Sequence, residues 1–329
     1  MKENHIEILS CPKCKEPLRI DKYEKDADGN IETGSLSCIK CAAVYPIIRH
    51  IPRFVPIDNY SNSFGLEWTM HAQTQYDSYS GANVSETRFF NETDWNRDLS
   101  GETILEAGCG SGRFTEQAAS TGGFVVSFDL SNAVEANYAS NGKKDNVLIV
   151  QADIYNLPFR ENFFDKVFCM GVIQHTPEPE KAFISLSRYI KKGGNIVIDT
   201  YRKYHWSFHM LNTKYWVRPL TRKIKPENLY RIVSAYVRLM WPVCRIINKL
   251  PFGRWINVAL LVADYRGVYD LNEKTLLEWA ILDSFDKVSP RYDYPQTKES
   301  ISKWFEDAGL TDIETGYGYN GVYGRGIKP

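Results

Sequence analysis

The 329-residue sequence has no run of 18 consecutive apolar residues and no excess of charge of either sign. A membrane-spanning helix needs an apolar run of about that length, so none is expected. The first residues, MKENHIEILSCPKC, lack the apolar centre of a secretory signal peptide. With 40 basic and 40 acidic residues the net charge is zero, and no overall field points to nucleic acid. We therefore expect a globular protein located in the cytoplasm.

Cysteine is too scarce for a disulfide framework, with seven residues in the whole chain. Four of them form two Cys-x-x-Cys pairs, Cys11 with Cys14 and Cys38 with Cys41. Two such pairs on facing turns place four thiolates around zinc. Metal binding stabilises segments too short for a core of their own, by about 10–16 kcal/mol in zinc-finger peptides. A thiol redox pair is the alternative, which the doubled motif disfavours. We expect a structural zinc, since four thiolates leave no open position.

The sequence also has no GK[ST] motif, which argues against a Walker-type phosphate-binding loop. It has instead a glycine-rich stretch, ETILEAGCGSG, at residues 102–112. Its apolar start is typical of a buried parallel strand, and Gly108, Gly110 and Gly112 then permit a sharp turn with bare N–H groups facing a ligand. A helix is expected from Arg113. The spacing is GxGxG rather than the GxGxxG of dinucleotide sites, and strand, turn and helix together indicate a nucleotide-binding sheet.

Further apolar segments continue this pattern. Strands are expected over residues 124–131, 147–159, 165–175 and 194–200. Asp129 ends the first of these segments, where a carboxylate is placed to accept the hydroxyls of a ribose. Asp153 lies at the tip of the next one. The pattern predicts a Rossmann-like α/β sheet with helices on both faces.

Residues from about 100 to 200 resemble a class I S-adenosylmethionine-dependent methyltransferase of the type 11 group. The motifs that carry the resemblance are ExGxGxG, an acid after the second strand, ADIxxLPF, and DxVxxxGVIQH before a helix. The resemblance implies S-adenosylmethionine as cofactor, with the glycines and Glu106 at its methionine part, Asp129 at the ribose and Asp153 with Ile154 at the adenine. The cofactor-binding residues that it implies are Glu106, Gly108, Gly110, Gly112, Asp129, Leu130, Asp153, Ile154 and Met170. A related domain that binds another nucleoside, or none, is the alternative.

Residues 1–57 resemble the small zinc-ribbon subunit that activates several tRNA and protein methyltransferases, here fused in cis. Residues 58–100 then form a connecting helical segment before a cofactor-binding core at 101–200. Trp68, His71, Gln75 and Tyr76 share one face if their segment is helical. We expect that face to serve packing rather than ligand contact.

Gln174 and His175 end the fourth strand of the core, at the edge where open α/β sheets bind ligands. The resemblance places this turn beside the methyl group that is transferred. His175 is therefore a candidate general base, with Gln174 beside it as a second catalytic candidate. The alternative is that both side chains only shape the pocket through hydrogen bonds.

Residues 201–270 depart from the minimal methyltransferase and predict an inserted helical cap, broken by Pro242. Between Arg202 and Arg254 basic and aromatic residues are frequent, and Glu227 is the one acid. Such a cap could hold a phosphorylated small substrate, lie on an anionic membrane surface through residues 201–254, contact RNA, or simply be a packed cap with solvated charges.

The C-terminal part, 271–329, predicts two amphipathic helices and two final strands that complete the methyltransferase fold. Between the helices, SPRYDYPQT forms a loop bounded by prolines. Binding groups often lie on such loops, so Arg291, Tyr292 and Asp293 are candidates for contacts to the acceptor. A loop held by its own hydrogen bonds is the alternative.

These observations favour methyl transfer to an O or N atom of a small molecule, such as a sugar or another biosynthetic intermediate. An RNA methyltransferase is the competing enzyme class, and a non-catalytic binding scaffold is a third possibility. No NPPY-like or catalytic-cysteine motif for base methylation is present.

Overall fold

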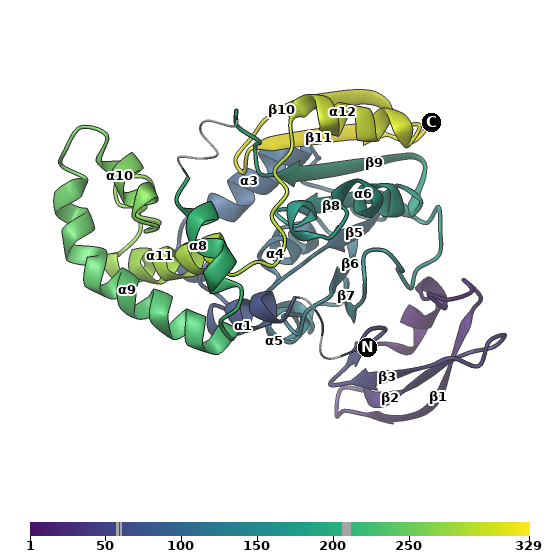
Figure 1. The fold of residues 1–329 in the computed structure, drawn as a ribbon. Helices are drawn as coiled ribbons and strands as arrows, with labels where there is room; N and C mark the ends of the chain where they lie inside the picture. The colour runs from purple at the N-terminus through teal and green to yellow at the C-terminus, as the bar shows by residue number, and fades with distance from the viewer. Residues whose placement is uncertain (57–58, 60, 206–211) are drawn as a thin grey trace.

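The computed structural model describes residues 1–56, 59, 61–205 and 212–329. The expected domain boundary at 57/58 and two aromatic residues of the expected cap, Trp206 and Phe208, lie outside the described residues. Two sheets with helices on both sides of the larger one confirm the predicted α/β fold (Figure 1).

The larger sheet has seven strands in the order β10-β11-β9-β8-β5-β6-β7. Its strands are β5 (Thr103–Ala107), β6 (Phe124–Asp129), β7 (Val147–Gln151), β8 (Phe164–Met170), β9 (Ile190–Thr200), β10 (Thr311–Tyr317) and β11 (Val322–Ile327). The five strands β5–β9 run parallel, whereas β11 and β10 complete the sheet as an antiparallel pair. Strands buried on both faces need continuous apolar runs, which is how the sequence reads here.

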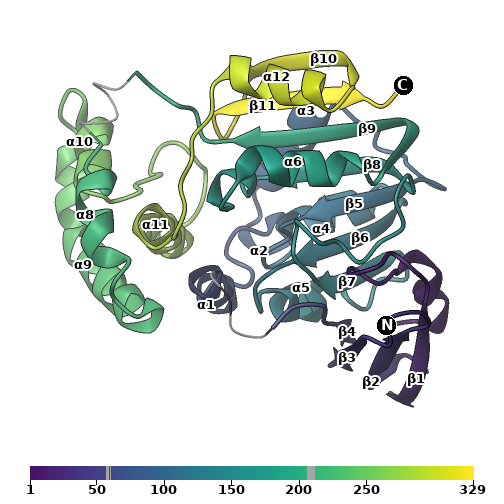
Figure 2. The same cartoon turned by 45° about the vertical axis from the view of Figure 1, so that its right-hand side comes forward.

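Alternate residues of these strands enter two different cores, as the period of a strand requires. Ile104 and Val125 pack toward α3 (Val84–Thr93), α4 (Arg113–Ser120) and α5 (Val134–Asn141). Their neighbours Leu105 and Val126 pack toward α6 (Pro179–Ser187) and α12 (Lys298–Asp307). Figure 2 shows the sheet between these two helical layers.

The N-terminal residues form a separate antiparallel sheet that lies against the β7 edge of the larger one. Its elements are η1 (Glu3–Ile8), β1 (Leu18–Lys25), β2 (Ile31–Cys38), β3 (Val44–Ile48) and β4 (Ile51–Pro52). Arg53 bridges to Gln151 of β7, and its Nη1 donates to Gln151 Oε1 at 2.7 Å. The N–H of Phe54 donates to the carbonyl oxygen of Gln151 at 2.9 Å. Backbone bonds therefore join the small sheet to the edge strand of the large one.

The segment between the sheets contains α1 (Asn62–Met70) and α2 (Asp77–Ser80). Because α1 ends at Met70, the expectation of one helical face through Trp68, His71, Gln75 and Tyr76 is wrong. The chain turns after His71, so these four residues do not lie on one helix.

Residues 201–270 contain α8 (Lys214–Thr221), α9 (Pro226–Ile247) and α10 (Gly253–Ala259), and α9 packs on the following α11 (Glu273–Val288). The expected break at Pro242 is wrong, because α9 runs through it. Pro242 removes the donor to the carbonyl oxygen of Arg238, and both residues are exposed, which allows water to take the donor's place. No helix within the described residues is long and apolar enough to cross a bilayer.

Candidate functional site

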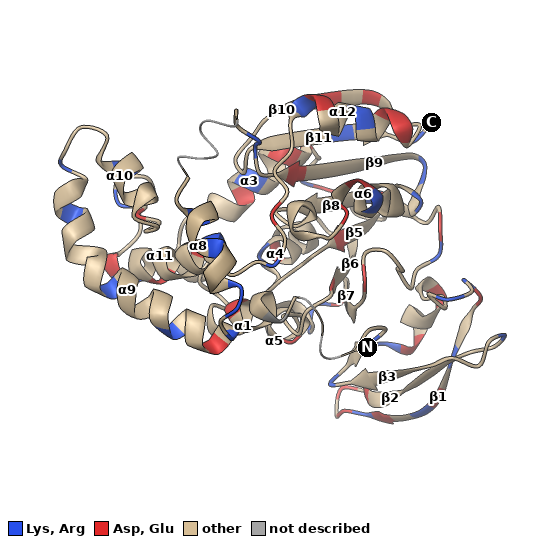
Figure 3. Ribbon diagram, viewed as in Figure 1, with Lys and Arg blue, Asp and Glu red and all other residues tan. Residues whose placement is uncertain are grey.

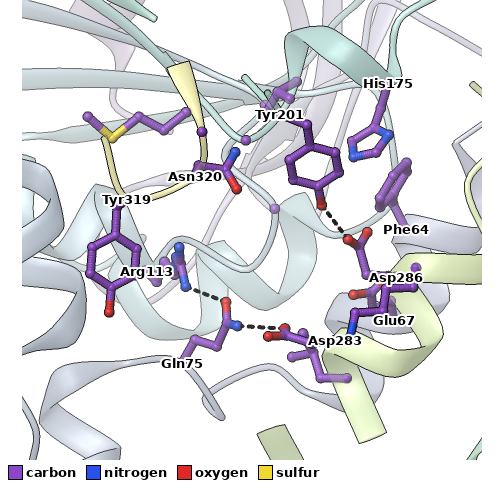
Figure 4. Close-up of a pocket in the computed structure, with 18 of the residues that line it drawn as sticks. Phe64, Glu67, Gln75, Arg113, His175, Tyr201, Asp283, Asp286, Tyr319 and Asn320 are labelled. Atoms are coloured by element: carbon purple, nitrogen blue, oxygen red, sulfur yellow. Dashed lines mark hydrogen bonds between the residues drawn. The ribbon is translucent and has the colours of Figure 1, made fainter. Parts of the chain in front are cut away.

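A cavity of about 730 Å³ opens at the carboxyl ends of the parallel strands, between the sheet, α1 and α11 (Figure 4). One half of it is lined by the glycine turn after β5 and by the ends of β6, β7 and β8. The residues of this half are Gly108, Gly110, Asp129, Leu130, Ala152, Ile154 and Met170. Backbone N–H groups, a carboxylate and apolar side chains are the donor set that a nucleoside with an amino acid tail requires, so these residues fit S-adenosylmethionine.

The glycine turn adopts left-handed backbone angles, with φ of +72° at Gly108, +52° at Gly110 and +98° at Gly112. Gly110 N–H donates to Asp129 Oδ2 at 2.9 Å, which ties the turn to the end of β6. Gly112 does not line the cavity, and it packs against Asn137 of α5. The absence of a side chain at Gly112 therefore lets the start of α4 lie close to α5.

We expect Gly112→Ala to destabilise the fold strongly. A Cβ atom would stand 2.1 Å from Asn137 Oδ1, and the backbone angle would remain left-handed. Overpacking and such a backbone angle each cost about 1–3 kcal/mol. Gly81→Ala is the matched control, because its φ is +75° but nothing lies within 4 Å of its Cβ position. Urea unfolding should show a clearly larger loss for Gly112→Ala, and equal losses would contradict the packing role.

Asp129 lines the cavity and also holds the turn. Its Oδ1 accepts from the N–H and the hydroxyl of Ser131, both at 2.7 Å. Burial raises the pKa of Asp129, while these bonds oppose the rise.

Glu106 and Asp153 occupy different positions from Asp129. Glu106 is 1% exposed and does not line the cavity, because its carboxylate accepts from the hydroxyls of Thr115 and Ser127. Burial raises the pKa of Glu106 to about 7. Asp153 accepts from the N–H of Tyr155 at 3.1 Å, while its neighbours in the chain line the cavity. In this structure neither carboxylate lines the cavity, and both are hydrogen-bonded to residues beside it.

The other half of the cavity contains three carboxyl groups, from Glu67 of α1 and from Asp283 and Asp286 of α11 (Figure 4). Tyr201 donates its hydroxyl to Asp286 Oδ2 at 2.7 Å. Gln75 Nε2 donates to Asp283 Oδ1 at 3.2 Å. Glu67 is 1% exposed, and neither of its carboxylate oxygens has a hydrogen-bond partner in the described part of the chain.

Burial governs the charge of this acidic group. It raises the pKa of Glu67 well above the usual range, and Asp286 and Asp283 add to the effect. It also raises the pKa of Asp283 to about 6, with Asp286 contributing and the bond from Tyr265 opposing. Lys287 lines the same region, and burial lowers its pKa. Burial therefore favours a neutral carboxyl group at Glu67, and the carboxyl oxygens of this region can accept hydrogen bonds from donor groups of a ligand.

Sequence reasoning missed these three acids. Asp283 and Asp286 are three residues apart and thus on one side of α11, which was a usable signal. Glu67 had none, because only the packing of α1 against α11 brings it near them. Trp68 and Gln75 also line the cavity, beyond the packing role expected for them.

His175 lines the cavity between the rings of Phe64 and Tyr201, at centroid distances of 5.2 and 5.3 Å. Its Nδ1 lies 3.0 Å from the carbonyl oxygen of Tyr292, which can only accept, so Nδ1 carries the proton. Nε2 therefore keeps a lone pair, and this buried atom has no hydrogen-bond partner among the described residues. Gln174 is fully buried and does not line the cavity.

The loop candidates Arg291, Tyr292 and Asp293 do not line the cavity. Arg291 is exposed. Asp293 pairs with Lys214 at 2.9 Å and Arg218 at 3.3 Å. Burial opposes its ionisation, but Lys214, His175 and Arg218 together lower the pKa of Asp293. In this structure these ion pairs fasten α8 to the loop that also orients His175.

The four paired cysteines come together in the N-terminal sheet. Their Sγ atoms all lie within 4.8 Å of one another. Cys11 Sγ lies 3.6 Å from Cys41 Sγ, and Cys14 Sγ lies 3.4 Å from Cys38 Sγ. Four converging thiols fit a tetrahedral zinc ion with no open position.

Comparison with known families agrees with this geometry. Residues 105–198 match the family model described as a methyltransferase domain, and residues 2–49 match the model described as Trm112p-like protein. The two matches cover the glycine turn with its strands and all four cysteines.

Curated relatives of two kinds resemble the chain. A ubiquinone biosynthesis O-methyltransferase from Xanthomonas oryzae pv. oryzae is 28% identical over 176 residues, 50% of this chain and 72% of the relative. A tRNA U34 carboxymethyltransferase from Campylobacter hominis is 26% identical over 211 residues, 61% of this chain and 68% of the relative.

Among solved structures, a SAM-dependent methyltransferase from Aquifex aeolicus aligns with a TM-score of 0.42 and 13% identity, over 82% of this chain and 98% of the other. A complex of the Haloferax volcanii Trm112 methyltransferase activator with its proposed methyltransferase aligns with a TM-score of 0.41 and 13% identity, over 78% of this chain and 98% of the other. The family matches and the site geometry identify an S-adenosylmethionine-dependent methyltransferase domain at residues 105–198 and a Trm112p-like domain at residues 2–49, whose four cysteines fit a structural zinc ion.

Proposed function

We propose that this enzyme methylates an O or N atom of a small polar molecule, such as a sugar or another biosynthetic intermediate, held in the acidic half of the cavity. The observation that carries the proposal is the continuity of one cavity from the cofactor half to Glu67, Asp283 and Asp286. A donor-rich acceptor would satisfy carboxylate oxygens that are costly to bury without partners.

The walls of this half suit a small ligand. Aromatic side chains alternate with the acids around the cavity, and they offer flat apolar surfaces beside hydrogen-bond acceptors. The aromatic residues that line it are Phe64, Trp68, Tyr201, Tyr215, Tyr265, Tyr269 and Trp279. Pockets with apolar walls and a few placed polar groups are typical of small-molecule sites.

The cofactor supplies an electrophilic sulfonium methyl group, so the protein mainly has to align the acceptor. His175 can receive a proton at Nε2, because Tyr292 holds the proton of Nδ1. The carboxylates of Asp283 and Asp286 orient the acceptor, and Tyr201 fixes the position of Asp286. For a hydroxyl acceptor the imidazole would act as general base, while for an amine its role is smaller.

An RNA acceptor is the second candidate, favoured by the similarity to a tRNA-modifying relative. The charges in the acidic half of the cavity oppose it, because the carboxylates of Asp283 and Asp286 repel phosphate. Two lysines of this region do not offset them fully, since Lys214 is paired with Asp293 and burial lowers the pKa of Lys287. RNA would therefore have to present a single base to the acidic half.

The test is transfer of a labelled methyl group from S-adenosylmethionine to panels of sugars, polyols, amines and total RNA. We expect label in a small polar acceptor, and label only in RNA would overturn the proposal. Binding of S-adenosylmethionine without transfer to any panel would leave the enzyme class intact but contradict this acceptor class.

We expect acceptor binding to weaken as the pH falls through about 6. Burial raises the pKa of Asp283 to about 6, so this carboxyl group loses its charge below that pH. The KM for the acceptor should then rise at low pH, while in Asp283→Asn it should be high and nearly independent of pH in this range. The effect of pH on stability has the opposite sign. Because burial raises the pKa of Asp283, its ionisation costs free energy in the folded state. The free energy of unfolding therefore falls as the pH rises through about 6. A KM in the wild type that does not change between about pH 5 and about pH 7, roughly one unit either side of this pKa, would contradict the assignment.

A further inference from the structure

Helix α9 exposes a continuous row of apolar side chains. The row consists of Ile232, Tyr236, Leu239, Val243 and Ile246, at alternating intervals of four and three residues, and exposed Leu250 follows beyond the end of the helix. Such intervals place side chains on one face of a helix. Leu239 is 74% exposed and Ile246 67% exposed. The opposite side of the helix is already packed, since Val233, Val237 and Trp241 are buried in a cluster with α11.

Further exposed apolar side chains lie on α8 and at the start of α10. Trp216 and Leu220 of α8 are 64% and 69% exposed, and Phe252 and Trp255 at the start of α10 are 80% and 72% exposed. α10 packs against α9, where Asn257 Nδ2 donates to the carbonyl oxygen of Cys244 at 3.3 Å. We call the exposed apolar side chains of residues 214–259 the outer face. Single exposed apolar residues are ordinary, but a concentration on one helical unit marks an interaction surface.

Basic residues run beside the apolar row. Arg231, Arg238 and Arg245 recur every seven residues of α9, which places them in a line along the helix, and all three are exposed. Arg245 is paired with Glu273 of α11 at 2.9 Å. Lys249 and Arg254 follow, whereas Glu227 is the one acid between residues 214 and 259. Figure 3 shows Lys and Arg spaced along α9, on the part of the molecule farthest from the small N-terminal sheet.

We propose that the helical unit 214–259 docks on the surface of an anionic lipid bilayer, with the axis of α9 parallel to the surface. Leu, Ile, Phe and Trp side chains would enter the boundary between headgroups and acyl chains, as in interfacial amphipathic helices. Arg231 and Arg238 would contact anionic headgroups. Charge complementarity favours lipid over a second copy of the chain, because two such faces would bring like charges together.

The outer face adjoins the cavity. Val258 of α10 is 41% exposed and also lines the cavity, as does Tyr204, which is 56% exposed. Docking would therefore bring the cavity mouth close to the lipid surface. The docking itself does not depend on which acceptor the enzyme methylates.

The experiment is co-sedimentation of the full-length, zinc-loaded protein with two kinds of vesicle, phosphatidylcholine alone and phosphatidylcholine mixed with phosphatidylglycerol. We expect binding to the mixed vesicles only, weakened by salt. The double variant Leu239→Ser/Trp255→Ser should lose it. Arg231→Gln/Arg238→Gln should weaken it roughly 10- to 30-fold.

Matched controls lie elsewhere on the surface. Val44→Ser removes an apolar side chain that is 62% exposed in the N-terminal sheet, and Lys303→Gln removes an exposed charge on α12. Both should bind vesicles as the wild type does, and every variant should bind S-adenosylmethionine, which verifies its fold. The absence of binding to the mixed vesicles would overturn the proposal.

Two other outcomes would identify a different occupant. A dimer seen by sedimentation velocity that Leu239→Ser/Trp255→Ser dissociates, without vesicle binding, would show a second copy of the chain on the outer face. RNA binding that only the arginine variant loses, again without vesicle binding, would show an RNA surface. Either result overturns the lipid assignment.

Discussion

Cys14→Ser is expected to release the zinc ion and to lower the unfolding temperature of the whole protein. Cys14 lies among four thiols whose Sγ atoms are within 4.8 Å, so its loss leaves three ligands. Structural zinc contributes about 10–16 kcal/mol in finger peptides. Even a loss of about 4 kcal/mol would lower the unfolding temperature of a domain by roughly 10 °C.

The effect should extend beyond the N-terminal sheet because that sheet is joined to the large one. Lys15 Nζ donates to the carbonyl oxygen of Leu157 at 2.8 Å, and Arg53 is bonded to Gln151 of β7. Zinc content and calorimetric unfolding measure the result. Cys244→Ser is the control, since this buried cysteine is far from the four thiols in the chain and should leave the zinc content at one per protein. Full zinc in Cys14→Ser would contradict a four-cysteine site.

Asp129→Ala is expected to weaken binding of S-adenosylmethionine by about 100-fold, or about 2.8 kcal/mol. The substitution removes the carboxylate that lines the cofactor half of the cavity. It also removes the acceptor for Gly110 N–H and for Ser131, so the turn loses its tie to β6. Isothermal titration calorimetry gives the affinity directly.

Two companion variants separate ligand contact from loss of the turn. Asp129→Asn keeps the shape of the side chain and one acceptor oxygen, so it should preserve the fold and still bind weakly. Asp145→Ala removes a carboxylate whose side chain is 95% exposed, and its affinity should equal that of the wild type. Unchanged affinity in folded Asp129→Ala would show that the cofactor does not use this carboxylate.

Much of the scaffold could be predicted because local sequence encodes it. The apolar runs of the parallel strands, the glycines at 108–112 and the paired cysteines each specify a local geometry that hardly depends on the rest of the chain. Asp129 was placed at the ligand edge by the same reasoning, since parallel strands share one carboxyl edge, and it lines the cavity. The fourth strand was expected to reach Gln174 and His175, but β8 ends at Met170 and these two residues lie in the following short helix, Ile173–His175.

Helix continuity was harder to predict. Pro242 suggested a break, but a proline whose ring faces solvent is tolerated when the buried side of the helix is well packed, as it is on α11. Conversely, the segment through His71 looked helical by spacing, yet α1 ends at Met70. Both outcomes depend on contacts with other elements rather than on local preference.

The sequence by itself determined the sheet, the cofactor turn and the zinc ligands, since neighbouring residues produce each of them. Only the tertiary structure decided the acceptor half of the site. It places Glu67 of α1 beside Asp283 and Asp286 of α11. It also shows that Glu106 is bonded to Thr115 and does not line the cavity. The reason is that residues more than 200 positions apart meet only when helices pack, and no local pattern records which of their faces will meet.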